Sequence, residues 1–375
     1  MRSITEIEYF DGVKILVRAD FNVPIKNGAV TDDFRIRTAL PTINFLCEKG
    51  AKVILMSHLE VKEGEKATLA PVAEVLKKLG REVKFISNIR DANEFIDHEL
   101  DNGQCVLLEN LRLNEGEKKN DRKFAEELAS LADIFVNEAF SACHRKHASI
   151  VGVPKFLPSY AGFQLEKEVK NLSQAFNPAH PFIFILSGAK FETKLPLLEK
   201  FLRIADTVFV GGALANDIFK AKGYETGRSV VSDGSVDLSK YLSNPKLTVP
   251  VDVVIENNEI KAPDLLGKDE KIVDAGPATV ESLRGKINAA KFILWNGPLG
   301  LYEDGFTAAT AGVTRIVADH TSENKNVMSI VGGGDTVAAI ESLGISDKFT
   351  FLSTGGGAML DFLAQGNLPG IEALG

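Results

Sequence analysis

Short apolar runs alternate with segments of helical periodicity along this chain of 375 residues. Four runs in the first half predict strands that are buried on both faces: 13–17, 52–56, 105–108 and 134–136. Between residues 69 and 79, apolar side chains recur at helical spacing and stop before Gly80, which predicts a helix. The alternation predicts an α/β fold with doubly wound, Rossmann-like parallel sheets covered by helices on both faces.

The length indicates more than one domain, because single hydrophobic cores rarely grow beyond about 250–300 residues. Residues 162–176 have the character of a charged helix, and the NPAHP stretch at 177–181 would end it. We therefore expect a first domain at 1–160, an interdomain helix and hinge at 161–180, and a second domain that begins at 181.

Composition and charge argue against several classes of protein. No apolar run approaches the roughly 20 residues of a membrane helix, and the first residues lack the apolar core of a secretory signal, so we expect a cytoplasmic protein. The net charge of −8 argues against nucleic-acid binding. The three cysteines form no CxxC pair, and Cys143 with its neighbouring histidines matches no closed zinc site.

Glycine is concentrated in the second half, where 23 of the 32 glycines follow Phe182. Strands are predicted to begin at Phe182, Thr207, Ile272, Phe292, Val327 and Phe349. Each strand is followed by small residues: SGAK (187–190), GGAL (211–214), DAGPAT (274–279), WNGPLG (295–300), GGGDT (332–336) and STGGGA (353–358). One such exit alone would usually be turn geometry, but six together indicate a nucleotide site where backbone N–H groups approach phosphate. Neither a Walker A loop nor a GxGxxG fingerprint occurs.

Charged residues near these glycines suggest how a nucleotide is held. Pro196 predicts a first helical turn, which puts Lys194 at the positive end of a helix, where an anionic ligand would offset the unfavourable cation. For Lys194 and Lys190, a solvated surface lysine is an equally good interpretation. Asp335 is either a helix N-cap or a ligand of magnesium beside the phosphates. Glu303 either accepts hydrogen bonds from ribose hydroxyls or is an exposed loop acid.

The first half places cations beside its predicted strand ends. In RADFNVP, Arg18, Asp20 and Asn22 stand on alternate positions, which predicts a recognition edge or an internal ion pair. Three further arginines and a histidine also lie near predicted strand ends: Arg35, His58, Arg112 and Arg145. Any one arginine would usually be a surface salt-bridge partner, but their repetition favours a shared pocket for an anion.

Seven segments together resemble the signatures of the phosphoglycerate kinase family, in the same order: RADFNVP, ENLR, EAFSACHRKHAS, SGAKFETK, WNGPLGLYE, GGGDT and STGGGA. The resemblance covers almost the whole chain and implies reversible, magnesium-dependent phosphoryl transfer in glycolysis. It implies that 1–160 binds 3-phosphoglycerate or 1,3-bisphosphoglycerate, that 181–354 binds ADP or ATP, and that 355–375 returns to the first domain. A monomer is the family expectation.

The resemblance also implies individual roles. The substrate side would comprise Asp20, Asn22, Arg35, His58, Arg112 and Arg145. The nucleotide side would comprise Lys190, Lys194, Gly211, Gly212, Glu303, Gly333, Gly334, Asp335 and Thr336, with Asp335 as the metal ligand. Arg35, Lys194 and the N–H groups near Gly333 and Gly356 would assist direct in-line transfer without a covalent enzyme intermediate. Domain closure would bring the two ligands together and exclude water.

One departure from the family pattern bears on the substrate pocket. After His58 the family usually reads HLGRP, whereas this chain reads HLEVK, so that Glu60 replaces a glycine and Val61 an arginine. Three hypotheses therefore compete: an active phosphoglycerate kinase, a nucleotide-binding homologue with an altered or impaired substrate pocket, and a non-catalytic binding protein of the hinge type.

Overall fold

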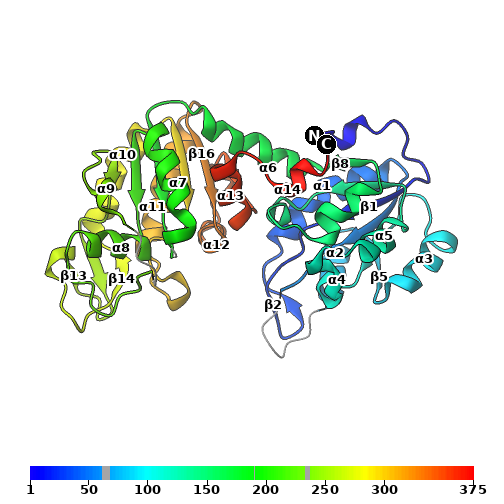
Figure 1. Cartoon of the computed structure of the whole chain (residues 1–375), viewed down its shortest axis with the longest axis horizontal. Helices are drawn as coiled ribbons and strands as arrows, with labels where there is room; N and C mark the ends of the chain where they lie inside the picture. The colour runs from blue at the N-terminus through cyan, green and yellow to red at the C-terminus, as the bar shows by residue number, and fades with distance from the viewer. Residues whose placement is uncertain (61–67, 190, 233–236) are drawn as a thin grey trace. The chain divides into compact units, whose positions relative to one another are not determined.

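The computed structural model in Figure 1 describes residues 1–60, 68–189, 191–232 and 237–375. Val61 and Lys190, both singled out from the sequence, lie outside the described residues. The chain divides into two compact units. Unit 1 comprises Met1–Lys170 and Gln365–Gly375, and unit 2 comprises Asn171–Ala364.

Unit 1 is built on a six-stranded parallel sheet in the order β5-β6-β4-β1-β7-β8. Its strands are β1 (Lys14–Arg18), β4 (Lys52–Met56), β5 (Val83–Ile86), β6 (Cys105–Leu108), β7 (Ile134–Asn137) and β8 (Ser159–Ala161), and β2 (Ile25–Lys26) pairs with β3 (Ala29–Val30) in a separate hairpin. Its helices are α1 (Phe34–Glu48), α2 (Ala70–Lys78), α3 (Ile89–His98), α4 (Glu115–Lys119), α5 (Arg122–Ala129), most of α6 (Phe163–Ser173), and α14 (Pro369–Glu372). The four strands predicted in this half are confirmed to within one residue.

Continuous apolar runs form the central strands because helices cover both faces of the sheet (Figure 1). Ile15, Leu16 and Val17 of β1 are fully buried. Burial of each such side chain stabilises the fold by roughly 1.5–3 kcal/mol. A central position in the sheet buries all three, and β1 lies between β4 and β7. In the central strands β1 and β4, charged residues occupy only the first or last position: Lys14, Arg18 and Lys52.

Unit 2 has a second six-stranded parallel sheet, in the order β11-β10-β9-β15-β16-β17. Its strands are β9 (Phe182–Leu186), β10 (Thr207–Val210), β11 (Leu247–Thr248), β15 (Phe292–Asn296), β16 (Met328–Gly332) and β17 (Phe351–Leu352). The main helices are α7 (Phe191–Ile204), α8 (Ala213–Ala221), α10 (Pro277–Ala289), α11 (Ala308–Glu323), α12 (Gly334–Ser342) and α13 (Gly357–Gln365), and α9 (Ser239–Leu242) is a single turn.

One predicted strand belongs to a different sheet. The strand at Ile272, β14 (Ile272–Ala275), joins β12 (Val253–Ile255) and β13 (Ile260–Lys261) in an antiparallel sheet. The sixth strand of the parallel sheet is instead β11, which the sequence analysis missed. β11 has only two residues, both half-buried, so its sequence carries almost no strand pattern.

The start of α7 also differs from the prediction. The helix begins at Phe191, and Pro196 lies inside it rather than in its first turn. Proline is favoured in the first turn of a helix, but a helix can also contain a proline at a later position if it loses one backbone hydrogen bond there. A proline alone therefore does not locate the first residue of a helix. Lys194 nevertheless lies in the first turn, as predicted.

Both parallel sheets contain a topological switch point. β1 has β4 on one side and β7 on the other, and β9 likewise lies between β10 and β15, so the chain builds each sheet outward in two directions. Ligands of open α/β sheets bind beyond the carboxyl ends of the strands at such points. The fold therefore directs attention to the residues that follow β1 and β7 in unit 1 and β9 and β15 in unit 2.

Candidate functional site

Four arginines lie at the carboxyl-terminal side of the sheet in unit 1, and we call them the arginine cluster: Arg18, Arg35, Arg112 and Arg145. Arg18 ends β1, and Arg112 lies in the short helix that follows β6. Arg145 follows β7, and Arg35 lies in the first turn of α1. The positive charges of all four arginines lower the pKa of His58, which follows β4.

Asp20 and Asn22 organise one side of the cluster. The Asp20 carboxylate accepts hydrogen bonds from Arg35 Nη1 at 2.7 Å and from Ser141 Oγ at 2.6 Å. Asn22 Oδ1 accepts from the backbone N–H of Glu60 at 2.8 Å. Asp20 is therefore ion-paired, but with Arg35 rather than with Arg18 of its own segment, and the pair orients Arg35.

His58 lies between two arginines. Its Nδ1 is 3.0 Å from Arg18 Nη2, and its Nε2 is 3.4 Å from Arg145 Nη1. Burial and then the charges of Arg18, Arg112 and the other arginines hold the pKa of His58 well below its usual value, so the ring is neutral. Because Nδ1 accepts the shorter contact from Arg18, we assign the ring proton to Nε2.

Glu60 links the rest of the cluster. Its Oε1 accepts from Arg145 Nη1 at 2.9 Å and lies 3.1 Å from Arg112 Nη2. Partial burial raises the pKa of the Glu60 carboxyl, but the charges and hydrogen bonds of Arg145 and Arg112 outweigh this effect and lower it overall. Through Glu60, all six residues predicted for the substrate side belong to one network of contacts: Asp20, Asn22, Arg35, His58, Arg112 and Arg145.

Arg18 is a member that the sequence analysis named within RADFNVP but that the resemblance did not assign to the substrate side. The side chain is fully buried, and its Nε donates to Ser149 Oγ at 2.8 Å. Ser149 Oγ in turn donates to Glu117 Oε1 at 2.7 Å. A charged residue at the end of an otherwise apolar strand was the available signal, and a buried cation of this kind requires such partners.

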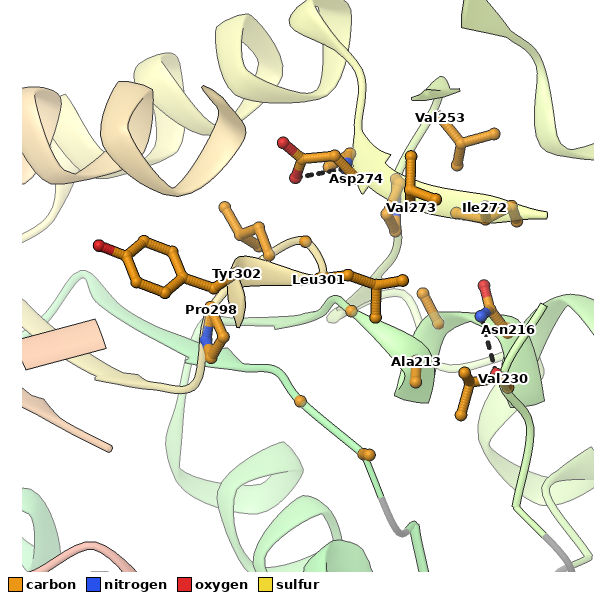
Figure 2. Close-up of a pocket in the computed structure, with 18 of the residues that line it drawn as sticks. Ala213, Asn216, Val230, Val253, Ile272, Val273, Asp274, Pro298, Leu301 and Tyr302 are labelled. Carbon is orange, nitrogen blue, oxygen red and sulfur yellow. Dashed lines mark hydrogen bonds between the residues drawn. The ribbon is translucent and has the colours of Figure 1, made fainter. Parts of the chain in front are cut away.

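Unit 2 contains a cavity of about 380 Å³ beyond the carboxyl ends of its strands. Segments that follow β9, β10, β15 and β16 line it together with β14: Gly188, Ala189, Gly212, Ala213, Ala215, Asn216, Phe219, Val230, Pro250, Val253, Ile272, Val273, Asp274, Ala275, Pro298, Leu299, Gly300, Leu301, Tyr302, Glu303, Asp304 and Asp335. Figure 2 shows Val253, Val273 and Leu301 around this space. Its walls are largely apolar, and Gly212, Glu303 and Asp335 are the predicted nucleotide residues among them.

Glycine is required where β10 turns into α8. Gly212 has φ +58°, and a Cβ atom there would lie 2.8 Å from the backbone nitrogen of Gly188. A Cβ on the preceding Gly211 would lie 2.8 Å from Leu299 Cδ2. Any side chain at either position would push apart the segments that form the cavity wall.

Lys194 lies at the edge of this wall. Only 8 % of the residue is exposed, and Nζ donates to the backbone oxygen of Ser187 at 2.7 Å. A Cβ on Gly188, which lines the cavity, would be 2.6 Å from this Nζ. Burial lowers the pKa of Lys194 to about 8, and the positive end of the α7 dipole is a further penalty for a cation. A solvated surface lysine is thus excluded, and a bound anion would relieve both penalties.

The start of α12 supplies further polar groups. Gly333 is the N-cap, and Gly334, Asp335 and Thr336 form the first turn, so the N-cap interpretation of Asp335 is wrong. Within the described part of the chain, the buried Oγ1 of Thr336 has no hydrogen-bond partner. Burial, and then the charge of Glu303, raise the pKa of Asp335.

These groups fit a magnesium ion that arrives with a nucleotide. Among the described residues, no three His, Cys, Asp or Glu side chains gather into a metal-binding group. Mg²⁺ often takes only one or two protein carboxylates and completes its shell with phosphate oxygens and water. The Asp335 carboxylate and the unsatisfied Thr336 hydroxyl beside it suit this arrangement.

Two side chains in the cavity were missed. Asn216 Nδ2 donates to the carbonyl oxygen of Val230 at 2.8 Å, and its buried Oδ1 has no partner in the described residues (Figure 2). The Asp274 carboxylate accepts from the N–H of Ala309 at 3.1 Å, at the start of α11, and burial raises its pKa to about 6. Asn216 belongs to no segment that the sequence analysis named, and Asp274 opens DAGPAT, from which no single residue was singled out. Their positions depend on α8 and on the antiparallel sheet.

Gly356, predicted to assist transfer, directly precedes α13 and has φ +49°. It is not among the residues that line the cavity. Within the described ranges, no helix combines the length and apolar character needed to cross a membrane.

The chain matches the family model for phosphoglycerate kinase over residues 4–366. It is 44% identical to the phosphoglycerate kinase of Dictyoglomus turgidum, over 98% of this chain and 96% of that protein, and 42% identical to that of Fervidobacterium nodosum, over 97% and 96%. It superposes on the solved phosphoglycerate kinase of Pyrococcus horikoshii with a TM-score of 0.86 and 34% identity, covering 100% of this chain and 98% of that structure. For the Coxiella burnetii structure, the TM-score is 0.81 at 36% identity, with 99% and 98% covered. The chain therefore belongs to the phosphoglycerate kinase family.

Proposed function

We propose that this chain catalyses reversible phosphoryl transfer between 1,3-bisphosphoglycerate and ADP, which gives 3-phosphoglycerate and ATP. The observation that carries the proposal is the pairing of an arginine cluster with a glycine-lined cavity in a chain that matches this family across both units. Each part suits one of the two anionic ligands. In this proposal, residues 1–160 bind the glycerate, 181–354 bind the nucleotide, and 161–180 connect them.

On the substrate side, guanidinium groups hold the phosphate and the carboxyl end of the glycerate. Arg112 is suited to this role because its buried Nε has no hydrogen-bond partner in the described part of the structure. His58 donates its Nε2 proton to the ligand, since its low pKa keeps the ring neutral. Asp20 keeps Arg35 oriented, and Asn22 holds the backbone that follows β4.

On the nucleotide side, the apolar walls accept the base, and Glu303 accepts hydrogen bonds from the ribose. The phosphates lie against Lys194 and the first turn of α12, where Gly333, Gly334 and Thr336 offer donors to an anion. Asp335 holds Mg²⁺, which neutralises phosphate charge when it is bound. Lys190 is assigned to the same phosphates from the resemblance alone.

Transfer breaks the bond between phosphorus and the acyl oxygen and forms a bond from phosphorus to a β-phosphate oxygen of ADP. Arg35, Lys194 and the N–H groups near Gly333 and Gly356 stabilise the charge on the transferring group. The reacting atoms must approach to about 3–3.5 Å, so we propose that the two units close on each other during the reaction.

The hypothesis of a homologue with impaired transfer is not favoured, since identity to phosphoglycerate kinases extends over nearly the full length of this chain. The hinge-type binding protein has no support from these comparisons. Cytoplasmic location, a monomeric state and the use of Mg²⁺ stay predictions from the sequence.

The test is a coupled assay with MgATP and 3-phosphoglycerate, in which glyceraldehyde-phosphate dehydrogenase reports 1,3-bisphosphoglycerate by oxidation of NADH. We expect rapid turnover, and a fall in kcat of roughly 100-fold or more for Lys194→Ala with a much smaller change in MgADP affinity. Lys325→Ala is the matched control, because Lys325 is exposed and lies before β16, away from the carboxyl ends of the strands. No turnover by the wild-type protein would refute the proposal, and an unchanged kcat would remove Lys194 from the mechanism.

A further inference from the structure

Glu60 places a carboxylate oxygen between two arginines of the cluster. One atom, Oε1, lies within 3.1 Å of both Arg112 Nη2 and Arg145 Nη1. Guanidinium donors that converge on one oxygen in this way are the usual means of holding a carboxylate or phosphate ligand. The protein's own side chain thus stands at the position where an anionic ligand would be bound.

The backbone at this position is fixed independently of the carboxylate. The N–H of Glu60 donates to Asn22 Oδ1 at 2.8 Å. The preceding Leu59 both donates to Asn110 Oδ1 at 2.9 Å and accepts from Asn110 Nδ2 at 3.0 Å. These bonds hold the backbone of Leu59 and Glu60, so the carboxylate can leave by rotation of its side chain alone.

The two arginines and Glu60 differ in exposure. The side chains of Arg112 and Arg145 are 11% and 28% exposed, whereas that of Glu60 is 50% exposed. A half-exposed carboxylate loses little hydration when it is bound and regains water when it is released, so such pairs contribute little to stability. A ligand with several negative charges can therefore displace it.

A side chain tethered beside its partners acts at a high effective concentration and competes with every free anion for them. Without Glu60, Arg112 and Arg145 would lack this carboxylate, and Arg112 Nε has no partner among the described residues in any case. The Asp20 carboxylate is directed to Arg35 and Ser141, and Glu117 to Ser149. Glu60 is thus the carboxylate of the cluster that contacts this pair.

We propose that Glu60 is a built-in competitor for the Arg112–Arg145 pair, which the substrate must displace in order to bind. The proposal rests on the proposed function only in taking 3-phosphoglycerate as the natural ligand of the cluster. Glu60 then sets the affinity of the site: it weakens the binding of every anion that uses the pair, by one common factor, and leaves the nucleotide cavity unaffected.

The test compares wild-type protein with Glu60→Gln, which removes the charge and nearly preserves the shape. Calorimetric titrations with sulfate and with 3-phosphoglycerate at constant ionic strength should both show affinity increased roughly three- to tenfold, by similar factors. In the coupled assay, KM for 3-phosphoglycerate should fall while kcat stays within twofold. MgADP affinity should not change.

Glu126→Gln is the matched control. Glu126 forms a single exposed ion pair with Arg122, at 2.9 Å, so its replacement changes the net charge of unit 1 equally without touching the cluster. Its sulfate and substrate affinities should equal those of the wild-type protein, and a gain equal to that of Glu60→Gln would overturn the proposal, because bulk charge would then be the cause. Melting temperatures of all three proteins check that each is folded.

Weaker or unchanged binding of both anions in Glu60→Gln would also overturn the proposal, since Glu60 would then position the arginines or contact the substrate rather than compete with it. Sulfate binding does not depend on catalysis. Stronger sulfate binding without turnover in either protein would therefore support the competitor role and refute the proposed function. Turnover by the wild-type protein with unchanged anion binding in Glu60→Gln would support the proposed function and refute the competitor role.

Discussion

Unit 1 gathers four arginines at the carboxyl ends of its strands, whereas unit 2 places glycines and apolar side chains at the corresponding ends of its own sheet. The two sheets share their parallel topology and their switch point. What differs is the residue type at the strand exits. A small acid with little apolar surface must be held by charged side chains, while a nucleotide also presents a base to apolar walls and phosphates to backbone N–H groups.

The comparison extends to buried ionisable groups. Unit 1 buries the Glu138 carboxyl, which accepts from the N–H of Gln164 at 3.2 and 3.1 Å at the start of α6. Unit 2 buries the ammonium of Lys194. Burial moves both pKa values to about 8 from opposite directions. The same physical cause should therefore give the two units opposite dependences on pH.

Arg35→Ala should have the largest effect, because side chains rather than the backbone carry binding in unit 1. The change removes a donor to the substrate and leaves the Asp20 carboxylate without its arginine beside an anionic ligand. We expect kcat/KM for 3-phosphoglycerate to fall roughly 10²–10³-fold in the coupled assay. MgADP affinity, measured by calorimetry, should change less than twofold. Arg37→Ala, on the same helix, is the control, and a loss confined to MgADP binding would break the comparison.

Glu138 should make stability fall as the pH rises. Burial raises its pKa from 4.5 to about 8 in the folded protein, so its contribution is complete below about pH 4.5 and is lost as the pH rises through 8. Between pH 6 and 9 this loss should amount to about 3 kcal/mol, because one pH unit corresponds to about 1.4 kcal/mol. Urea denaturation at the two pH values measures it. Glu138→Gln should reduce the difference and Glu126→Gln should not, and an unaltered difference in Glu138→Gln would contradict the assignment.

Lys194 should act in the opposite direction. Its pKa is lowered from 10.5 to about 8, so the unfolded chain binds more protons between these values and stability rises with pH there. Lys194→Met should remove this rise and stabilise the protein at pH 7 by up to about 3 kcal/mol, less the lost hydrogen bond to Ser187. Urea denaturation at pH 7 and pH 10 would show it. If Lys194→Met were less stable than the wild-type protein at pH 7, the contacts of the Lys194 ammonium in the folded protein would outweigh the cost of burying its charge, which would contradict the prediction.

Gly212→Ala tests whether the backbone forms the second site. The added Cβ would lie 2.8 Å from Gly188 N at a positive φ, at a cost of about 2 kcal/mol. Calorimetry should show weaker MgADP binding with unchanged binding of 3-phosphoglycerate. Gly223→Ala is the control, because Gly223 has φ +81° but open space around its Cβ. Equal losses in both variants would assign the effect to backbone conformation instead of close approach.

Glu303→Ala should have the smallest effect, since one side chain contributes little where backbone and apolar walls do most of the binding. Loss of its hydrogen bonds to the ribose should weaken ADP by about 1 kcal/mol, or roughly fivefold. The same variant should bind 2′,3′-dideoxy-ADP as well as the wild-type protein does. Equal losses for ADP and the dideoxy nucleotide would remove Glu303 from the ribose.

Features that depend on one segment of the chain could be predicted from the sequence. The strands β1, β4, β6, β9, β10 and β15 are apolar runs, and burial on both faces follows from composition. The grouping of Arg112, Arg145 and His58 followed from the rule that parallel strands end at one edge. These predictions did not require knowing which strands pair or which loops meet.

Features that depend on pairing could not be predicted. β14 has the composition of a parallel strand, yet it pairs antiparallel with β12, and nothing within its four residues encodes that direction. Glu60 was recognised as a replacement that could weaken the substrate pocket. Its contacts with Arg112 and Arg145 depend on how two distant loops meet, which composition does not specify.

The division of unit 1 between both ends of the chain affects how the protein is made. Gly370 donates its N–H to Cys143 O at 2.8 Å, and a Cβ there would lie 2.8 Å from Cys143 Cα, so the segment that follows unit 2 packs tightly on unit 1. During translation, residues up to Lys170 leave the ribosome well before Gln365 is synthesised. Unit 2 is continuous and can finish folding as soon as it emerges. The surface of unit 1 around Cys143 stays uncovered until the last residues of the chain are synthesised. In a nascent chain halted before Gln365, that surface is therefore accessible to chaperones and proteases.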